Sequence, residues 1–125
     1  MGASSSRWHV AALVLAALHH LDHVLRGRHV GWPVTDEVNT FTYTLAIYPF
    51  ILLGFALRSA RYWLLAAAGG LSILTAVHVF IEMPGEILGG YAEPLAGVLA
   101  LAVLAALVVL LALLTWRYAA QSMPK

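Results

Sequence analysis

Four ionisable side chains interrupt the first long apolar stretch of the chain. They are His19, His20, Asp22 and His23, and they follow directly after the run VAALVLAAL. Helix positions three or four residues apart share a face, so His19, Asp22 and His23 are expected to project from one side. His20 is expected just beyond the edge of that face. Imidazole and carboxylate groups bind divalent transition metals, and imidazole also exchanges protons near neutral pH.

A second pair of such groups, His78 and Glu82, lies in the stretch HVFIE with a four-residue spacing. Pairs on facing helices form metal sites inside helical bundles. The expected metal ligands are therefore His19, His23, His78 and Glu82. Asp22 is expected to be a further ligand or to orient one of the histidines. Neutral imidazole with carboxylate favours Zn or Fe, and a chain without cysteine offers no thiolate ligand.

Oxygen-bearing side chains at the start of the second apolar stretch are expected at the same depth. Among them, Glu37 and Tyr43 are the expected proton donors or acceptors of the site. If the ion is catalytic, this set of groups fits redox or hydrolytic chemistry. If the ion is cargo, the same groups fit metal handling.

Three alternatives to a non-haem metal site stay open. Haem b could lie between His78 and one of the three clustered histidines of the first stretch. The same groups could form a structural network or proton path in a non-catalytic accessory subunit of a larger membrane complex. The third alternative is a proton-transfer enzyme that acts on a lipid-soluble substrate. The stretch HVFIE resembles the His-x-x-x-Glu pair of sterol Δ8-Δ7 isomerases over five residues, and this resemblance implies such proton transfer.

The composition is that of an integral membrane protein. Of the 125 residues, 62% are hydrophobic and only 10% are charged, against about 25% charged in a soluble domain. The formal net charge of +1 argues against a nucleic-acid partner. We expect one four-helix transmembrane domain that covers residues 1–125.

Four apolar stretches are long enough to span a bilayer, which takes about 20 residues. The predicted helices cover about 8–26, 37–57, 62–82 and 92–117. No small-x-small cleavage site follows the first stretch before the histidines, so it is expected to be a retained helix. Pro49 lies inside the second stretch and is expected to kink it. Short connectors predict an up-down-up-down bundle.

The distribution of basic residues predicts the orientation. One side of the membrane receives Arg7, Arg58, Arg61, Arg117 and Lys125. The other side receives only Arg26 and Arg28. Both termini are therefore expected to be cytoplasmic, in a multi-pass protein of the cell inner (plasma) membrane. The histidine and carboxylate site then lies near the outer leaflet.

The fourth stretch, 92–117, has no polar side chain between Pro94 and Thr115. A helix that is apolar all round contacts lipid or other protein. Beyond the lipid bilayer, the expected partner is a second copy of the chain or a larger membrane complex that docks on this helix.

Overall fold

The computed structural model describes residues 3–26, 40–81 and 94–122, which are helical apart from two short turns. The elements in chain order are α1 (Ala3–Arg26), α2 (Thr40–Thr44), α3 (Ile47–Leu57), α4 (Ala60–Ala76), the π-helix η1 (Val77–Ile81) and α6 (Pro94–Ser122). The predicted all-α class is confirmed for the described residues.

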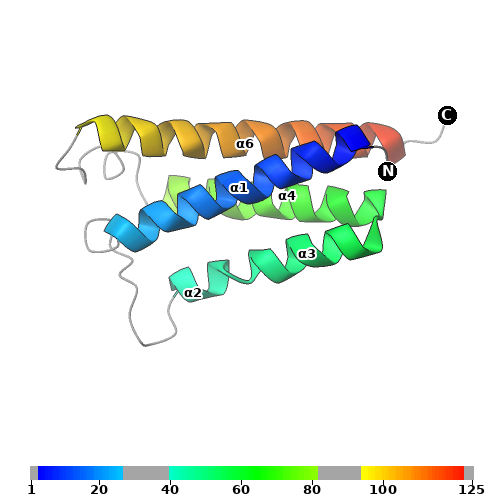
Figure 1. Cartoon of the computed structure of the whole chain (residues 1–125), viewed down its shortest axis with the longest axis horizontal. Coiled ribbons are helices and arrows are strands. Elements are labelled where there is room, and N and C mark those ends of the chain that lie inside the picture. Colours follow the sequence, from blue (N-terminus) through cyan, green and yellow to red (C-terminus); the bar gives the residue numbers. More distant parts are fainter. Residues whose placement is uncertain (1–2, 27–39, 82–93, 123–125) are drawn as a thin grey trace.

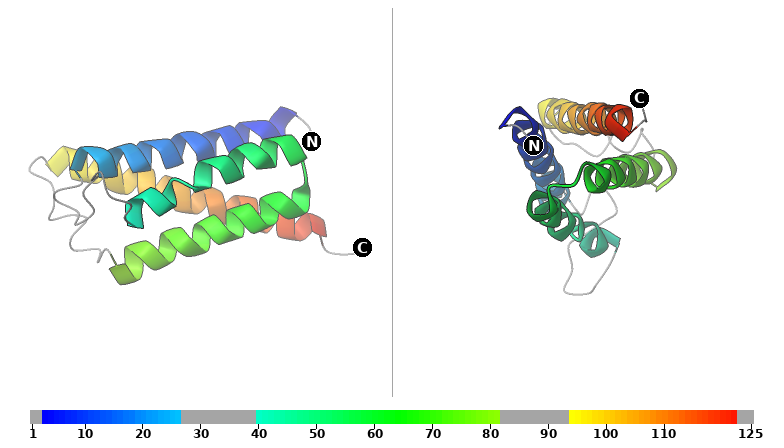
Figure 2. Two further views of the ribbon diagram at one scale, coloured as in Figure 1. Left: turned by 90° about the horizontal axis from the view of Figure 1, so that it is seen from below. Right: turned by 90° about the vertical axis from the view of Figure 1, so that its right-hand side faces the viewer.

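Successive long helices alternate in direction along the bundle (Figure 1). Helices α1 and α4 run one way, α3 and α6 run the other way, and both chain termini lie at the same end (Figure 1). The main packing pairs are α4 with α6, α1 with α6 and α3 with α4. The views in Figure 2 show α3 alongside both α1 and α4. The C-terminal end of α1 and the end of η1 therefore share the end of the bundle that is remote from the termini.

Three helices are long and apolar enough to cross a membrane, namely Arg7–Leu25, Ala60–Phe80 and Leu95–Ser122. A shorter apolar helical stretch covers Thr42–Leu57. Less than a third of each long span is buried inside the bundle. Most of their apolar surface thus faces outward, where a soluble monomer rarely exposes large apolar patches.

The second predicted helix, 37–57, is interrupted in its described part. Helices α2 and α3 are separated at Leu45 and Ala46, four and three residues before Pro49. A proline ring clashes with the carbonyl four residues earlier, here that of Leu45, and proline has no N–H to donate to it. Instead, Tyr48 N–H donates to the Leu45 carbonyl at 3.2 Å. The disturbance expected from Pro49 therefore falls one turn before the proline itself.

The hairpin between α3 and α4 is closed by local hydrogen bonds. Arg58 adopts a left-handed conformation with φ of 51°, and its N–H donates to the Gly54 carbonyl. Ser59 caps α4 by accepting a hydrogen bond from the Tyr62 N–H. Gly54 meets the indole of Trp63 so closely that a Cβ atom at Gly54 would lie 2.7 Å from the ring. The two helices therefore approach each other through glycine.

The buried face of α1 follows a spacing of three and four residues. Its buried positions are His9, Ala12, Ala16, His19 and His23. This is the spacing of a helix–helix seam. The small alanines in the middle of the seam allow the neighbouring helices to approach closely, as in membrane bundles. Histidines thus occupy both ends of one packed stripe.

Candidate metal site

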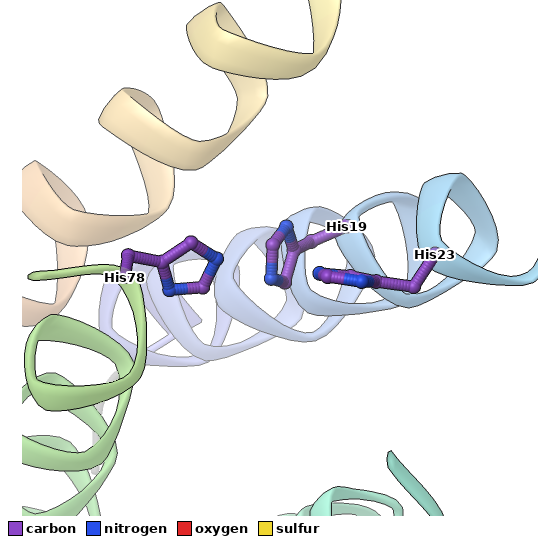
Figure 3. A group of neighbouring side chains, drawn as sticks. All are labelled: His19, His23 and His78. Atoms are coloured by element: carbon purple, nitrogen blue, oxygen red, sulfur yellow. The ribbon is translucent and has the colours of Figure 1, made fainter. Parts of the chain in front are cut away.

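Three histidines from two distant parts of the chain converge at one end of the bundle. His19 and His23 come from α1 and His78 from η1, and one nitrogen of each lies within 4.8 Å of the others. Figure 3 shows the ring of His19 between those of His23 and His78. The four-residue spacing of His19 and His23 brings both to the face of α1 that meets η1. The juxtaposition predicted for these three residues is therefore present.

The rings are close enough to share one small ligand. The ring centroids of His19 and His23 are 4.7 Å apart, with the ring planes at 89°. The centroids of His19 and His78 are 4.9 Å apart, and those of His23 and His78 are 6.2 Å apart. The three imidazoles form a compact triangle around a common point.

The site is withdrawn from the surface of the molecule. His19 and His23 are 8% and 7% exposed. His78 is half-buried, but its Nε2 atom is buried. Burying polar groups costs free energy unless they are hydrogen-bonded or ligated. Three imidazoles at one such point therefore each need a hydrogen-bond or ligand partner.

The protonation of the His78 ring follows from its hydrogen bond. Its Nδ1 atom lies 2.7 Å from the backbone carbonyl of Leu74. A carbonyl only accepts hydrogen bonds, so Nδ1 carries the proton and Nε2 carries the lone pair. A hydrogen bond of this kind fixes the tautomer and ring orientation of metal-binding histidines. Nε2 is therefore the atom of His78 that can bind a metal ion.

His78 lies in a widened helical turn. The predicted helix 62–82 runs as α4 and then as the π-helix η1, in which hydrogen bonds span five residues instead of four. At the start of η1, Val77 N–H approaches the carbonyls of both Ile73 and Leu74. Single π turns occur frequently at functional sites. The irregular turn and the histidine triangle coincide here.

His20 is directed to a different partner. Its Nδ1 atom lies 2.7 Å from the hydroxyl oxygen of Tyr48 in α3. Its ring centroid is 6.0 Å from that of His19, and it is not one of the three converging histidines. The expectation that His20 lies beyond the edge of the histidine face agrees with this position. The hydrogen bond joins α1 to α3 beside the site.

Two other predicted site residues, Asp22 and Tyr43, are not part of this triangle. Asp22 is half-buried on α1, and the convergent group of the described residues consists of the three histidines without it. Tyr43 is 72% exposed on α2. Tyr48, the second residue of α3, contacts a histidine instead. Glu37 and Glu82 lie outside the described residues.

A second cluster, of aromatic side chains around the single histidine His9, lies near the other end of the bundle. His9 is 1% exposed, the lowest exposure of any described histidine. Its Nε2 atom is 2.8 Å from the hydroxyl oxygen of Tyr118, and its ring stacks on Trp63 with centroids 3.9 Å apart. Phe55 meets the same ring edge-on. Side chains from α1, α3, α4 and α6 thus meet around His9.

The role of His9 was not recognised from the sequence, although a signal was present. His9, Ala12, Ala16, His19 and His23 are separated by three, four, three and four residues. Extending the helical face of the two site histidines toward the N-terminus therefore leads to His9. Its contacts show a packing role at the junction of four helices.

The chain matches no protein-family model, no curated protein and no solved structure.

Proposed function

We propose that this chain is an integral membrane protein that binds one divalent transition metal ion, of the Zn or Fe type, through His19, His23 and His78. The observation that carries this proposal is the convergence of their three nitrogen atoms within 4.8 Å. Zn–N bonds of about 2.0–2.1 Å place tetrahedral ligand atoms roughly 3.3 Å apart. Side-chain rotations that move each ligand nitrogen by about 1 Å would therefore bring all three within bonding distance of one ion.

The chemical nature of the ligands supports a borderline transition metal. All three are imidazoles, and the chain has no cysteine. Imidazole nitrogen suits Zn, Fe, Cu and Ni, whereas Ca²⁺ and Mg²⁺ prefer oxygen ligands. The Leu74 carbonyl prepares His78 for this role, because it leaves the Nε2 lone pair free of the proton.

Three protein ligands leave a position open on a four-coordinate ion. Structural zinc sites have four protein ligands, whereas catalytic sites commonly have three and keep the fourth for water or substrate. The described residues supply three ligands, the number that catalytic sites use, while Glu82, predicted as a fourth, lies outside them. We therefore assign the site hydrolytic or redox chemistry at the ion, or transfer of the ion itself.

The same geometry favours a bare ion over haem b. Axial histidines bind haem iron from opposite faces of a flat macrocycle. The ring of His19 lies between those of His23 and His78 (Figure 3), where the plane of a haem held by the outer two would have to pass. A small ion needs no such space.

The membrane assignment rests on the three long apolar helices and on their outward apolar surface. We place the protein in the inner (plasma) membrane with both termini cytoplasmic, because positive charge gathers at the end where the termini lie. The histidine triangle then lies toward the outer side. Lipid is the main partner, and the apolar surface of α6 is the candidate contact with a second copy or a larger complex.

Metal analysis of the purified protein tests the proposal. The protein in mild detergent is stripped with a chelator, reloaded separately with Zn²⁺ or Fe²⁺, desalted and measured by elemental analysis. We expect about one ion per chain. His19→Ala, His23→Ala and His78→Ala should each weaken binding by more than the 10- to 100-fold typical of losing a group that only orients a ligand.

His20→Ala is the matched control, since His20 neighbours His19 but lies outside the triangle. This variant should retain the ion. Size-exclusion chromatography and far-UV circular dichroism establish that each variant is folded. Equal metal content in the wild type and in all three triangle variants would refute the site.

A further inference from the structure

Four arginines lie at the end of the bundle that holds the chain termini (Figure 1). This arginine rim consists of Arg7, Arg58, Arg61 and Arg117. The first three side chains are exposed and the fourth is half-buried. In that order, the rim arginines belong to or directly follow α1, α3, α4 and α6. Positive charge is therefore distributed over every long helix at this end.

The acidic residues of the chain lie elsewhere. Asp22, the one acid within the described ranges 3–26, 40–81 and 94–122, is fifteen residues from Arg7, or about 22 Å along α1. The other five acids are each within five residues in sequence of Thr40, Ile81 or Pro94. Five residues span at most about 18 Å, whereas roughly 27–35 Å of helix separates those three positions from the rim. The chain is therefore too short to bring any Asp or Glu to the level of the rim.

Tryptophan and leucine side chains accompany the arginines. Trp8 and Trp116 are exposed, and each neighbours a rim arginine in sequence. Tryptophan gathers at the head-group level of a bilayer. Leu57 and Leu65 are exposed within four residues of a rim arginine. The rim thus combines cationic groups for lipid head groups with apolar side chains for acyl chains.

From this arrangement we infer that the arginine rim binds the head groups of anionic phospholipids in preference to those of zwitterionic phospholipids. The inference goes beyond metal binding and rests on the membrane assignment. Guanidinium groups donate paired hydrogen bonds to phosphate oxygens. Both lipid classes carry a phosphate, but the choline cation of a zwitterionic head group repels nearby arginines. An anionic head group has no such cation.

The distribution of the arginines favours lipid over an acidic protein as the occupant. Viewed along the bundle, the helices that carry them lie on different sides of the molecule (Figure 2). A protein partner covers one continuous patch, whereas separate lipid molecules reach all sides at once. Basic residues at the surface of an anionic leaflet each strengthen binding by a factor of about five.

Native mass spectrometry tests the inference. The protein in mild detergent is mixed with equal amounts of phosphatidylglycerol and phosphatidylcholine that have the same acyl chains, and the lipids retained by the chain are counted. The wild type should retain an excess of phosphatidylglycerol. Replacing both hairpin arginines, Arg58→Gln with Arg61→Gln, should reduce this excess by about fivefold or more. Raising the salt concentration should also reduce it, because exposed charges are screened.

Two matched controls separate charge from structure and one end of the bundle from the other. Arg58→Lys with Arg61→Lys retains both charges and should retain the excess. Arg26→Gln removes an arginine at the opposite end of α1 and should leave the excess unchanged. Equal retention of the two lipids by the wild type, or an undiminished excess in the double Gln variant, overturns the inference. Retention of neither lipid overturns the membrane assignment together with it.

Discussion

At the scale of single residues, the absence of a Cβ atom at one glycine allows two helices to pack closely. Gly54 in α3 lies against the buried indole of Trp63, and Trp63 in turn stacks on His9. Any displacement of the indole is therefore transmitted to the junction of α1, α4 and α6. The residue that permits this packing carries no chemistry of its own.

Gly54→Ala should destabilise the protein for this reason. The added Cβ would lie 2.7 Å from the Trp63 ring, and such overpacking costs about 1–3 kcal/mol. The free energy of unfolding, measured by titrating sodium dodecyl sulfate into the detergent-solubilised protein, should fall by this amount. Gly69→Ala is the control, since a Cβ at Gly69 meets nothing within 4 Å. An equal loss in both variants would show that helix packing is not the cause.

The residues of the site differ in how far the sequence specifies them. His19 and His23 follow from four-residue spacing, and His78 from being the histidine of another apolar stretch at the same depth. The contact between Tyr48 and His20 cannot be predicted from the sequence, because it depends on the direction that α3 takes after the break between α2 and α3. The three-dimensional position of a side chain beyond an irregular turn requires the geometry of that turn.

At the scale of elements, the sequence specifies helices better than it specifies their irregularities. The four apolar stretches correspond to α1, to α2 with α3, to α4 with η1, and to α6. Proline indicated a disturbance in the second stretch, since its chemistry is local. The π turn of η1 has no comparable residue signature in the sequence VHVFI. A proline can be read from the sequence, whereas a change in hydrogen-bond spacing that no residue marks cannot.

Pro49→Ala tests the origin of the break between α2 and α3. The substitution supplies an N–H for the Leu45 carbonyl and removes a ring that costs about 3 kcal/mol or more within a helix. We expect α2 and α3 to join, so that amides at positions 45–48 exchange hydrogen at least about tenfold more slowly. Mass-spectrometric hydrogen exchange in detergent measures this rate.

Pro94→Ala is the control for that experiment. Pro94 is the first residue of α6, a position where proline is tolerated because its missing N–H has no helical partner. Exchange rates within α6 should therefore change little. If exchange at positions 45–48 is unaffected by Pro49→Ala, the break is imposed by packing rather than by proline.

At the scale of the whole molecule, one aromatic cluster and one histidine cluster lie at opposite ends of α1. Around His9, side chains of four helices pack into an aromatic cluster. At the other end, α1 and η1 meet through the histidine triangle. The packed cluster lies at the end with the termini, and the candidate metal site lies at the opposite end (Figure 1). The bundle is thus chemically polarised along its length.

This polarity gives the orientation in the membrane a functional meaning, and the orientation can be measured. The chain has no cysteine, so single cysteines report position without background. Ser122 lies at the end of α6 that is shared with the termini. Leu25 is 76% exposed near the opposite end. Excess basic residues on the first side predict that it faces the cytoplasm.

In intact spheroplasts, a membrane-impermeant maleimide should therefore label Leu25→Cys. Ser122→Cys should be labelled only after the membrane is permeabilised. Each variant is the control for the other, because the same reagent is applied to single cysteines at opposite ends of the bundle. The reverse pattern would place the histidine triangle toward the cytoplasm, where cellular metal carriers rather than external ions would supply it.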